Sequence, residues 1–213
     1  MKQKSKYWII IIQALDSSAK LKTGRGIFID VNEWCNTPTI NIVPQYREVT
    51  SKIELQNVLD KIVDMIDEGD SVILHIESHG NYDGIWLVND GVGWEEFFQT
   101  THSLCEKAKK RIVFILSMCR SKHSASVLRQ YERIPFQYLI VSDDIVNSGP
   151  ACLAFKRFYK SFVKSKDIQK SFADLQDYYA YYNEECPYLL LTPQVLRRCF
   201  KDNHMCWFQN TNK

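Results

Sequence analysis

Short runs of almost uninterrupted apolar residues are the feature that most limits how this chain can fold. Each run has the length of a strand, and segments with helical spacing of apolar residues separate the runs. The runs are residues 7–13, 72–78, 112–117, 136–142 and 188–191. Strands that are apolar on both faces and alternate with amphipathic helices predict a mostly parallel sheet covered by helices on both sides.

The clearest helix signal follows residue 50. Ser51 and Glu54 form a capping-box pattern, and Gly69 supplies a stop after apolar residues at helical spacing. Residues 27–31 include two isoleucines and a valine, so we predict a short strand there, followed by a loop over residues 32–46. The further helices that we predict are residues 94–108, 124–132, 150–163 and 167–183.

Composition narrows the class of function. The 213 residues are 45% hydrophobic and 24% charged, and the net charge is +2. Because this excess of positive charge is small and no basic aromatic stripe is present, we expect no direct binding of nucleic acid. No apolar run reaches the roughly 18 residues that a membrane span needs. We expect residues 1–213 to form a single domain around one large core.

The cysteines indicate a reducing compartment. There are seven, scattered along the chain, which is not the pattern of a disulfide framework. We therefore predict free thiols and a cytoplasmic location. Cys199, His204 and Cys206 match no common zinc-finger spacing and lack a fourth ligand, so we predict no metal and no cofactor.

Two of the apolar runs end in residues that can carry nucleophilic chemistry. "SVILHIESHG" ends in His79 and Gly80, and "RIVFILSMCRS" carries Cys119 just beyond its last apolar residues. One helix-containing crossover joins the two runs, so we expect them to be neighbours in a βαβ unit, with both residues at the carboxyl edge where ligands bind. A thiol, an imidazole and backbone N–H groups are what a Cys–His hydrolase needs.

Both residues also have interpretations without chemistry. Cys119 could close a core strand as a small apolar residue. His75 and His123 compete with His79 for the catalytic role; His75 lies among apolar neighbours, which predicts burial, and His123 follows Cys119 in a loop. Gly80 favours His79, because glycine lets the backbone turn sharply and lets its N–H approach a ligand.

Taken together, these segments resemble the caspase-like cysteine peptidases, the group of caspases, metacaspases, separase and CHAT-domain proteases. "VILHIESHG" looks like the histidine motif of that group and "IVFILSMCRS" looks like its cysteine motif, separated by 119 − 79 = 40 residues. Residues 139–175 look like the end of a CHAT domain. The resemblance covers roughly residues 58–175 and implies an α/β caspase-like three-layer sandwich, with a mostly parallel central sheet and helices on both faces.

The resemblance also implies roles for matching residues. Cys119 matches the nucleophile, and His79 matches the histidine that protonates the leaving amine. The backbone N–H groups of Gly80 and Cys119 match the donors of the oxyanion hole. Ser121 stands where the caspase motif has glycine, and Ser117-Met118 replaces Gln-Ala, so a caspase selective for Asp is not expected.

The substrate-binding residues follow from the same resemblance. Ser117 matches a position that lines the specificity pocket, and Asp143 and Asp144 match a strand end that forms another wall. An acidic pocket there would favour Arg or Lys before the scissile bond. A solvated turn with a helix N-cap is the alternative for the two aspartates. Asp83, in the loop after Gly80, is a further candidate for substrate contact.

We therefore expect a cysteine endopeptidase with a His-Cys dyad, similar to small standalone CHAT-like bacterial proteases. The resemblance implies a specific protein substrate, such as a pore-forming or toxin effector in antiviral defence, and a regulatory partner protein. Two alternatives stay open. The fold could serve as a catalytically inactive scaffold or adaptor, or the chain could be a non-peptidase cysteine hydrolase on a related sheet.

Overall fold

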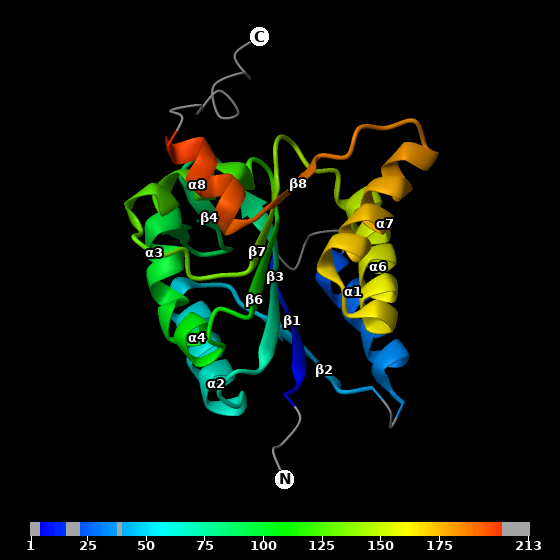
Figure 1. The fold of residues 1–213 in the computed structure, drawn as a ribbon, viewed down its shortest axis with the longest axis horizontal. Coiled ribbons are helices and arrows are strands. Elements are labelled where there is room, and N and C mark those ends of the chain that lie inside the picture. Colours follow the sequence, from blue (N-terminus) through cyan, green and yellow to red (C-terminus); the bar gives the residue numbers. More distant parts are fainter. Residues whose placement is uncertain (1–4, 16–21, 38–39, 202–213) are drawn as a thin grey trace.

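A sheet between two layers of helices forms the centre of the computed structural model, which describes residues 5–15, 22–37 and 40–201 (Figure 1). The strands along its main path are β1 (Tyr7–Ala14), β2 (Ile42–Glu48), β3 (Ser71–Gly80), β6 (Ile112–Ser117), β7 (Tyr138–Ser142) and β8 (Tyr188–Leu191). They lie in the order β2-β1-β3-β6-β7-β8. All neighbours on this path are parallel except β7 and β8, which are antiparallel. The predicted mostly parallel α/β sheet is confirmed.

A small hairpin extends the carboxyl end of β3. Its strands are β4 (Gly84–Trp86) and β5 (Gly91–Gly93), which pair with each other in antiparallel register. β4 also pairs with the last residues of β3, where His79 faces Trp86 and Gly80 faces Ile85. The predicted loop after Gly80 is therefore partly a hairpin.

The helices cover the two faces of the sheet in separate groups (Figure 1). One group consists of α2 (Lys52–Met65), α3 (Trp94–Thr100), α4 (His102–Lys107) and α8 (Pro193–Lys201), and the other of α1 (Thr23–Cys35), α6 (Ser148–Ser165) and α7 (Ile168–Tyr181). Short turns, η1 (Ser121–His123), α5 (Ser124–Val127) and η2 (Leu128–Gln130), follow β6. Ser51 caps α2 as predicted, because its side chain accepts a hydrogen bond from Glu54 N at 3.3 Å.

Alternate residues of the central strands pack on opposite faces. Ile10 and Ile12 of β1 join the core beneath α2, α3 and α4, whereas Ile9 and Ile11 join the core beneath α1, α6 and α7. Because both faces are buried, most positions of such a strand are apolar, and the polar residues Gln13, His75 and Glu77 are buried among them. This two-sided burial explains the continuous apolar runs of the sequence.

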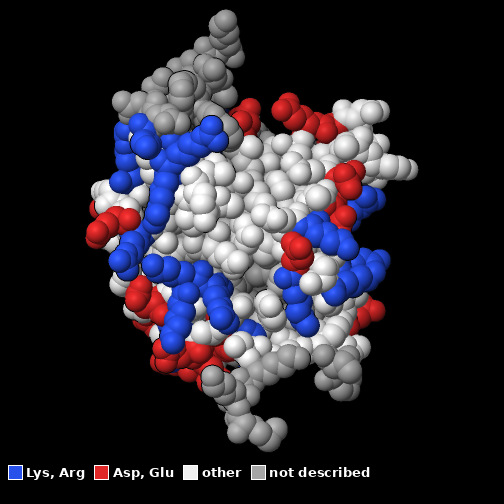
Figure 2. All heavy atoms as spheres, in the orientation of Figure 1, with Lys and Arg blue, Asp and Glu red and all other residues white. Residues whose placement is uncertain are grey.

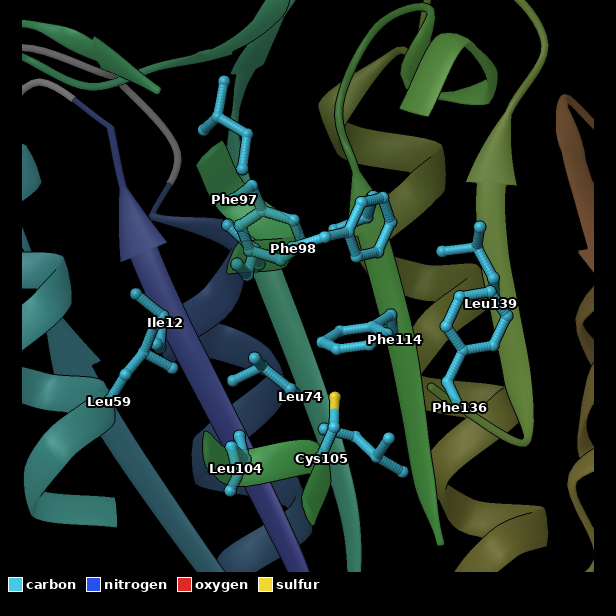
Figure 3. Close-up of a cluster of buried hydrophobic side chains, with 14 of the residues drawn as sticks. Ile12, Leu59, Leu74, Phe97, Phe98, Leu104, Cys105, Phe114, Phe136 and Leu139 are labelled. Atoms are coloured by element: carbon cyan, nitrogen blue, oxygen red, sulfur yellow. The ribbon is translucent and has the colours of Figure 1, made fainter. Parts of the chain in front are cut away.

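The core beneath α3 and α4 is largely aromatic. The rings of Phe97 and Phe98 lie edge to face against Phe114 of β6, with centroids 5.7 and 5.8 Å away (Figure 3). Cys105 lies in the same cluster, and burial raises the pKa of its thiol to about 12. Cys105 is therefore a packing residue.

The prediction for residues 27–46 is wrong. Residues 27–31 belong to helix α1, and residues 42–48 form strand β2. The buried residues Ile27, Val31 and Cys35 are spaced four apart, so their burial has the period of a helix although two of them are β-branched. β2 accommodates Pro44 because it pairs with β1 alone and lies at the edge of the sheet.

The helix predicted over residues 94–108 is also interrupted. Thr101 ends α3 with ψ of 0°, and its hydroxyl donates to the carbonyl of Phe98 at 3.1 Å. A buried threonine that bonds back to the preceding turn diverts the backbone from one continuous helix.

Charged side chains lie mainly over the helices. Figure 2 shows that lysines and arginines gather at the two sides of this view and that the surface between them carries few charges. In the described part of the chain, no helix combines the length and the apolar character that crossing a bilayer would require. His204 and Cys206, from the zinc site weighed above, lie outside the described residues.

Asp70 joins the amino ends of β1 and β3. Its buried carboxylate accepts hydrogen bonds from Lys6 N and Trp8 Nε1, both at 2.8 Å, and from Asp67 N at 3.1 Å. Burial acts to raise the pKa of this carboxyl, but the three donors outweigh burial and lower it. The charged form therefore stabilises the fold.

Replacing Asp70 by alanine should lower the free energy of unfolding at pH 7 by about 1–3 kcal/mol, because it leaves buried donors without an acceptor. A carboxyl whose pKa is lower in the folded state contributes stability above its unfolded pKa, and this stability is lost as pH falls through the folded value. The difference between wild type and variant should therefore shrink between pH 7 and pH 3 in urea titrations. Asp64→Ala, at an exposed position of α2, is the control; an equal loss from Asp70→Ala at both pH values would contradict the role of the charge.

Candidate active site

The register of β3 and β6 brings His79 and Cys119 to matching positions. Val72 pairs with Ile112 and Glu77 with Ser117, a constant offset of 117 − 77 = 40. His79 and Cys119 are also 40 residues apart, so each lies two residues beyond the last pair. Neighbouring strands are about 4.8 Å apart. The predicted βαβ neighbours are confirmed, and their carboxyl ends present the two residues at one edge of the sheet.

Gly80 lies against the turn that carries the cysteine. A Cβ atom at Gly80 would be 2.7 Å from Met118 Cγ and 3.0 Å from the carbonyl oxygen of Cys119. Real Cβ atoms essentially never approach a neighbour as closely as the first distance, and the second is tighter than most, so a side chain at position 80 would force the turn to shift. The segments that end in His79-Gly80 and Met118-Cys119 are thus in direct contact.

The backbone N–H of Gly80 points away from the hairpin. Asn81 N donates to the carbonyl of Gly84 at 3.1 Å, which makes Asn81 and Gly84 a hydrogen-bonded pair. Antiparallel partners alternate between hydrogen-bonded and non-hydrogen-bonded pairs, so the next pair, Gly80 and Ile85, belongs to the second kind. This N–H is therefore not engaged by β4.

The environments of the two side chains differ. His79 is exposed, whereas Cys119 is half-buried. The N–H of Val146, just before the first residues of α6, faces Cys119 Sγ at 3.4 Å and gives a thiolate a hydrogen-bond donor. Among the described residues, no direct hydrogen bond joins the His79 ring to the Cys119 sulfur.

The loop after Gly80 contacts the turn after Cys119. The guanidinium carbon of Arg120 lies 4.6 Å from the centre of the Tyr82 ring, and the His123 ring meets the same tyrosine edge to face at 4.5 Å. Arg120 has a left-handed backbone, with φ of 57°, and its N–H donates to the carbonyl of Asp144 at 3.0 Å. Burial, Lys122 and Arg120 lower the pKa of His123. His123 therefore serves this contact between loops.

Ser121 has a structural function in the turn after Cys119. Its hydroxyl donates to the carbonyl of Leu116 and accepts from the N–H of Ser142, both at 2.8 Å. The Ser142 hydroxyl in turn donates to the carbonyl of Met118. These bonds connect the end of β6 to the end of β7 and hold the turn that presents Cys119.

The aspartates after β7 are paired with cations. The Asp143 carboxylate contacts the ammonium group of Lys122, whose side chain is only 3% exposed. Asp144 is 63% exposed at its side chain and lies 3.9 Å from Arg120 Nε. The N-cap of the following helix α6 is Asn147, so neither aspartate fills that position. Asp83 is exposed in the turn between β3 and β4.

Ser117 and His75 lie within strands β6 and β3 and are buried. Ser117 is buried, and its hydroxyl lies 3.2 Å from the hydroxyl of Tyr188 on β8. His75 is fully buried, as predicted, and its ring nitrogens lie 2.9 Å from the Tyr159 hydroxyl and from Glu77. His75 is therefore inaccessible to a substrate. In the described ranges, no cluster of His, Cys, Asp or Glu side chains is placed to hold a metal ion.

Several contacts at this site join segments that are distant in the sequence and could not be predicted from it. The N–H of Val146 is a backbone group on a distant loop, and no local pattern marks it. The pairing of Lys122 with Asp143 joins segments 21 residues apart. Glu77, in contrast, left a visible signal, because it is an acidic residue inside an apolar run.

Comparisons with known proteins support the fold. No protein-family model matches the sequence, and no curated protein matches it. Among solved structures, the crystal structure of caspase-1 from Spodoptera frugiperda matches with a TM-score of 0.63, over 89% of this chain and 87% of that chain, at 10% sequence identity. At this identity the likeness shows the fold alone. The chain has the caspase-like fold that the sequence predicts.

Replacing Gly80 by alanine should lower the free energy of unfolding by about 1–3 kcal/mol, because the added methyl group overpacks the contact with Met118 and Cys119. In the Met118→Ala background the loss should be smaller, since part of the clash is removed. Chemical denaturation gives the free energy of unfolding of wild type, the two single variants and the double variant. Gly149→Ala is the matched control: its nearest neighbour, Asn147 Oδ1, is 4.0 Å away, and this change should be neutral or slightly stabilising. If Gly80→Ala were as stable as wild type, the close approach of Gly80 to Met118 and Cys119 would be excluded.

Proposed function

We propose that the chain is a cysteine endopeptidase that uses Cys119 as nucleophile and His79 as general acid. The observation that carries this proposal is the matching position of His79-Gly80 and Cys119 on adjacent parallel strands of a caspase-like sheet. Ligands of open α/β sheets bind at this edge, outside the carboxyl ends of the strands.

The proposed reaction proceeds through a thioester. The Cys119 thiolate attacks the scissile carbonyl carbon, and the carbonyl electron pair moves to oxygen. When the tetrahedral intermediate collapses, the C–N bond breaks and His79 donates its proton to the departing amine. Water then attacks the thioester, which releases the acid and restores the thiol. His79 need not contact the sulfur for these steps, which agrees with the absence of a hydrogen bond between the two in the described structure.

The proposed oxyanion hole uses backbone N–H groups of Gly80 and Cys119. The direction of the Gly80 N–H, away from β4, leaves it available for this role. Such donors stabilise the negative oxygen most when they are held in place before the reaction. The contact between Gly80 and the Cys119 turn provides that rigidity.

Substrate contacts are assigned to Ser117, Asp83, Asp143 and Asp144, with a basic residue before the scissile bond. The pairing of Asp143 with Lys122 compensates its charge, so of the two neighbouring aspartates Asp144 is the more accessible to a substrate cation. Exposed charges are weak sources of selectivity, because water screens them.

The proposed biological setting rests on the resemblance to standalone CHAT-like bacterial proteases. We propose a specific protein substrate, such as a pore-forming or toxin effector in antiviral defence, and a regulatory partner protein in the cytoplasm. A peptidase whose active site is folded and exposed must be inhibited until it is needed, since unregulated proteolysis damages the cell that produces it. That residues 1–213 form a single caspase-like domain stays a prediction.

Cys119→Ala should abolish cleavage of a proteome-derived peptide library, with a loss of at least about 1,000-fold in kcat/KM, because the nucleophile is removed. His79→Ala should reduce the same rate by about 100- to 10,000-fold, because the general acid is lost. Mass spectrometry of the products measures both. Cys186→Ala and His102→Ala replace another half-buried cysteine and an exposed histidine, and both should retain wild-type rates.

Equal cleavage by wild type and Cys119→Ala would refute the nucleophile. If wild type cleaves no peptide, covalent labelling of Cys119 by a peptidyl acyloxymethyl ketone distinguishes a latent enzyme from a scaffold. Labelling would favour an enzyme that awaits its partner, and failure to label would favour the scaffold.

A further inference from the structure

A cavity of about 640 Å³ lies at the edge of the sheet opposite the candidate active site. It is lined by the beginnings of four strands, among them Tyr7 of β1, Ser71 of β3 and Tyr138 of β7, and by the turn between α6 and α7. This is the amino edge of the sheet, which faces the N-terminus in Figure 1. Ser71 and His79 are 79 − 71 = 8 residues apart on one strand, a rise of about 26 Å. The cavity is therefore separate from the candidate active site.

Three cationic side chains from two turns line this cavity. Lys110 and Arg111 follow helix α4, and Lys166 follows helix α6. In the described part of the chain none of the three forms an ion pair with a carboxylate. The adjacent Lys109, by contrast, is paired with Glu68 at 2.6 Å. The cations of the cavity are thus available to an anionic ligand.

Asp167 is the one carboxylate among the lining residues, and it is engaged elsewhere. It is the N-cap of α7, and its carboxylate accepts a hydrogen bond from Lys170 N at 3.0 Å. The chain itself therefore caps the N-terminus of α7, which is not part of the site. The lining side chains carry a net charge of 3 − 1 = +2.

The backbone holds these cations in fixed places. Lys110 and Lys166 have left-handed φ angles of 64° and 55°, a conformation that glycine usually supplies after a helix. Arg111 Nη1 donates to the carbonyl of Gly69 at 3.1 Å, and a guanidinium has further N–H groups for an anion. A cation after a helix also offsets the negative end of the helix dipole. That effect does not require cations from the ends of two helices to line one cavity.

Aromatic rings line the same cavity. Tyr7 and Tyr138 are half-buried there, and the Tyr7 ring packs edge to face against the buried Phe162, with centroids 5.8 Å apart. The ammonium nitrogen of Lys166 lies 5.9 Å from the centre of the Tyr7 ring. Positive charge and aromatic surface therefore adjoin within one cavity.

We propose that this cavity binds a nucleoside phosphate. Lysine and arginine side chains are the usual protein ligands of phosphate oxygens, and aromatic side chains stack on bases. The exposed amides of Gln137 and Gln169 also line the cavity and offer donors and acceptors for the polar edge of a base. The volume lies within the range of about 300–1,000 Å³ that is typical of small-molecule sites. A nucleoside phosphate uses both the cations and the rings, whereas a polyphosphate without a base uses only the cations.

The test is isothermal titration calorimetry of the whole chain with ATP, GTP, CTP and UTP, and with inorganic tripolyphosphate. The buffer is metal-free and contains about 0.15 M salt, which screens long-range attraction. At least one nucleotide should bind with Kd below about 1 mM, and tripolyphosphate should bind at least about 10-fold more weakly, because it has no base to stack. Tyr138→Leu should lower the affinity for that nucleotide by about 5- to 100-fold and leave that for tripolyphosphate unchanged. Because both ligands are compared within one variant, partial unfolding does not change the ratio of their affinities.

The double variant Lys110→Gln with Lys166→Gln should weaken the binding of nucleotide and tripolyphosphate alike, by at least about 10-fold, since both lose phosphate ligands. Lys160→Gln with Lys164→Gln is the matched control, because it removes the same charge from exposed positions of α6 outside the cavity. The control should keep the wild-type affinity.

Three results would overturn the inference. The first is failure of all four nucleotides to bind wild type. The second is tripolyphosphate binding as tightly as the best nucleotide, which would remove the role of the rings. The third is an equal loss of affinity in the two double variants, which would reduce binding to general surface charge. None of these measurements depends on peptidase activity, so the inference and the proposed function are tested separately.

Discussion

The parallel pairing of β3 with β6 is the constraint on which the rest of the site depends. Hydrogen bonds between the two strands set an offset of 40 residues, and the same offset aligns His79 with Cys119 beyond the paired region. A slip of one residue would turn one of the side chains to the opposite face and expose apolar residues of a strand buried on both sides. Packing of the core therefore enforces the alignment of the candidate dyad. Gly80 continues this alignment into the turn, because the absence of a side chain lets it approach Met118 and Cys119 closely.

Charge is distributed unevenly around this edge of the sheet. Asp143 and Asp144, which follow β7, have cationic neighbours in Lys122 and Arg120, and both cations belong to the turn after Cys119. These pairs connect the ends of β6 and β7 and are part of the framework. Glu77 differs, because it is buried within the sheet and its partners are the Thr23 hydroxyl and the His75 imidazole.

Much of the architecture could be predicted from periodicity, and its failures have identifiable causes. The strands around Ile10, Leu74 and Phe114 are apolar at almost every position, because both of their faces are buried. Residues 27–31 misled the prediction because isoleucine and valine favour strands, whereas the spacing of Ile27 and Val31 against α6 and β1 is helical. β2 was missed because an edge strand buries only part of each residue and therefore shows little apolar character.

The sequence by itself determined the class of sheet and the candidates His79, Gly80 and Cys119. The spacing of apolar residues along each strand or helix, and the order of the motifs, can be read directly from neighbouring residues. Only the tertiary structure decided which polar groups act together. Lys122 meets Asp143, the N–H of Val146 meets the Cys119 sulfur, and Thr23 meets Glu77 across 54 residues of chain. Contacts of this kind depend on strand order and on the faces to which the connections turn. No local pattern encodes these properties, since they arise only when the whole sheet is assembled.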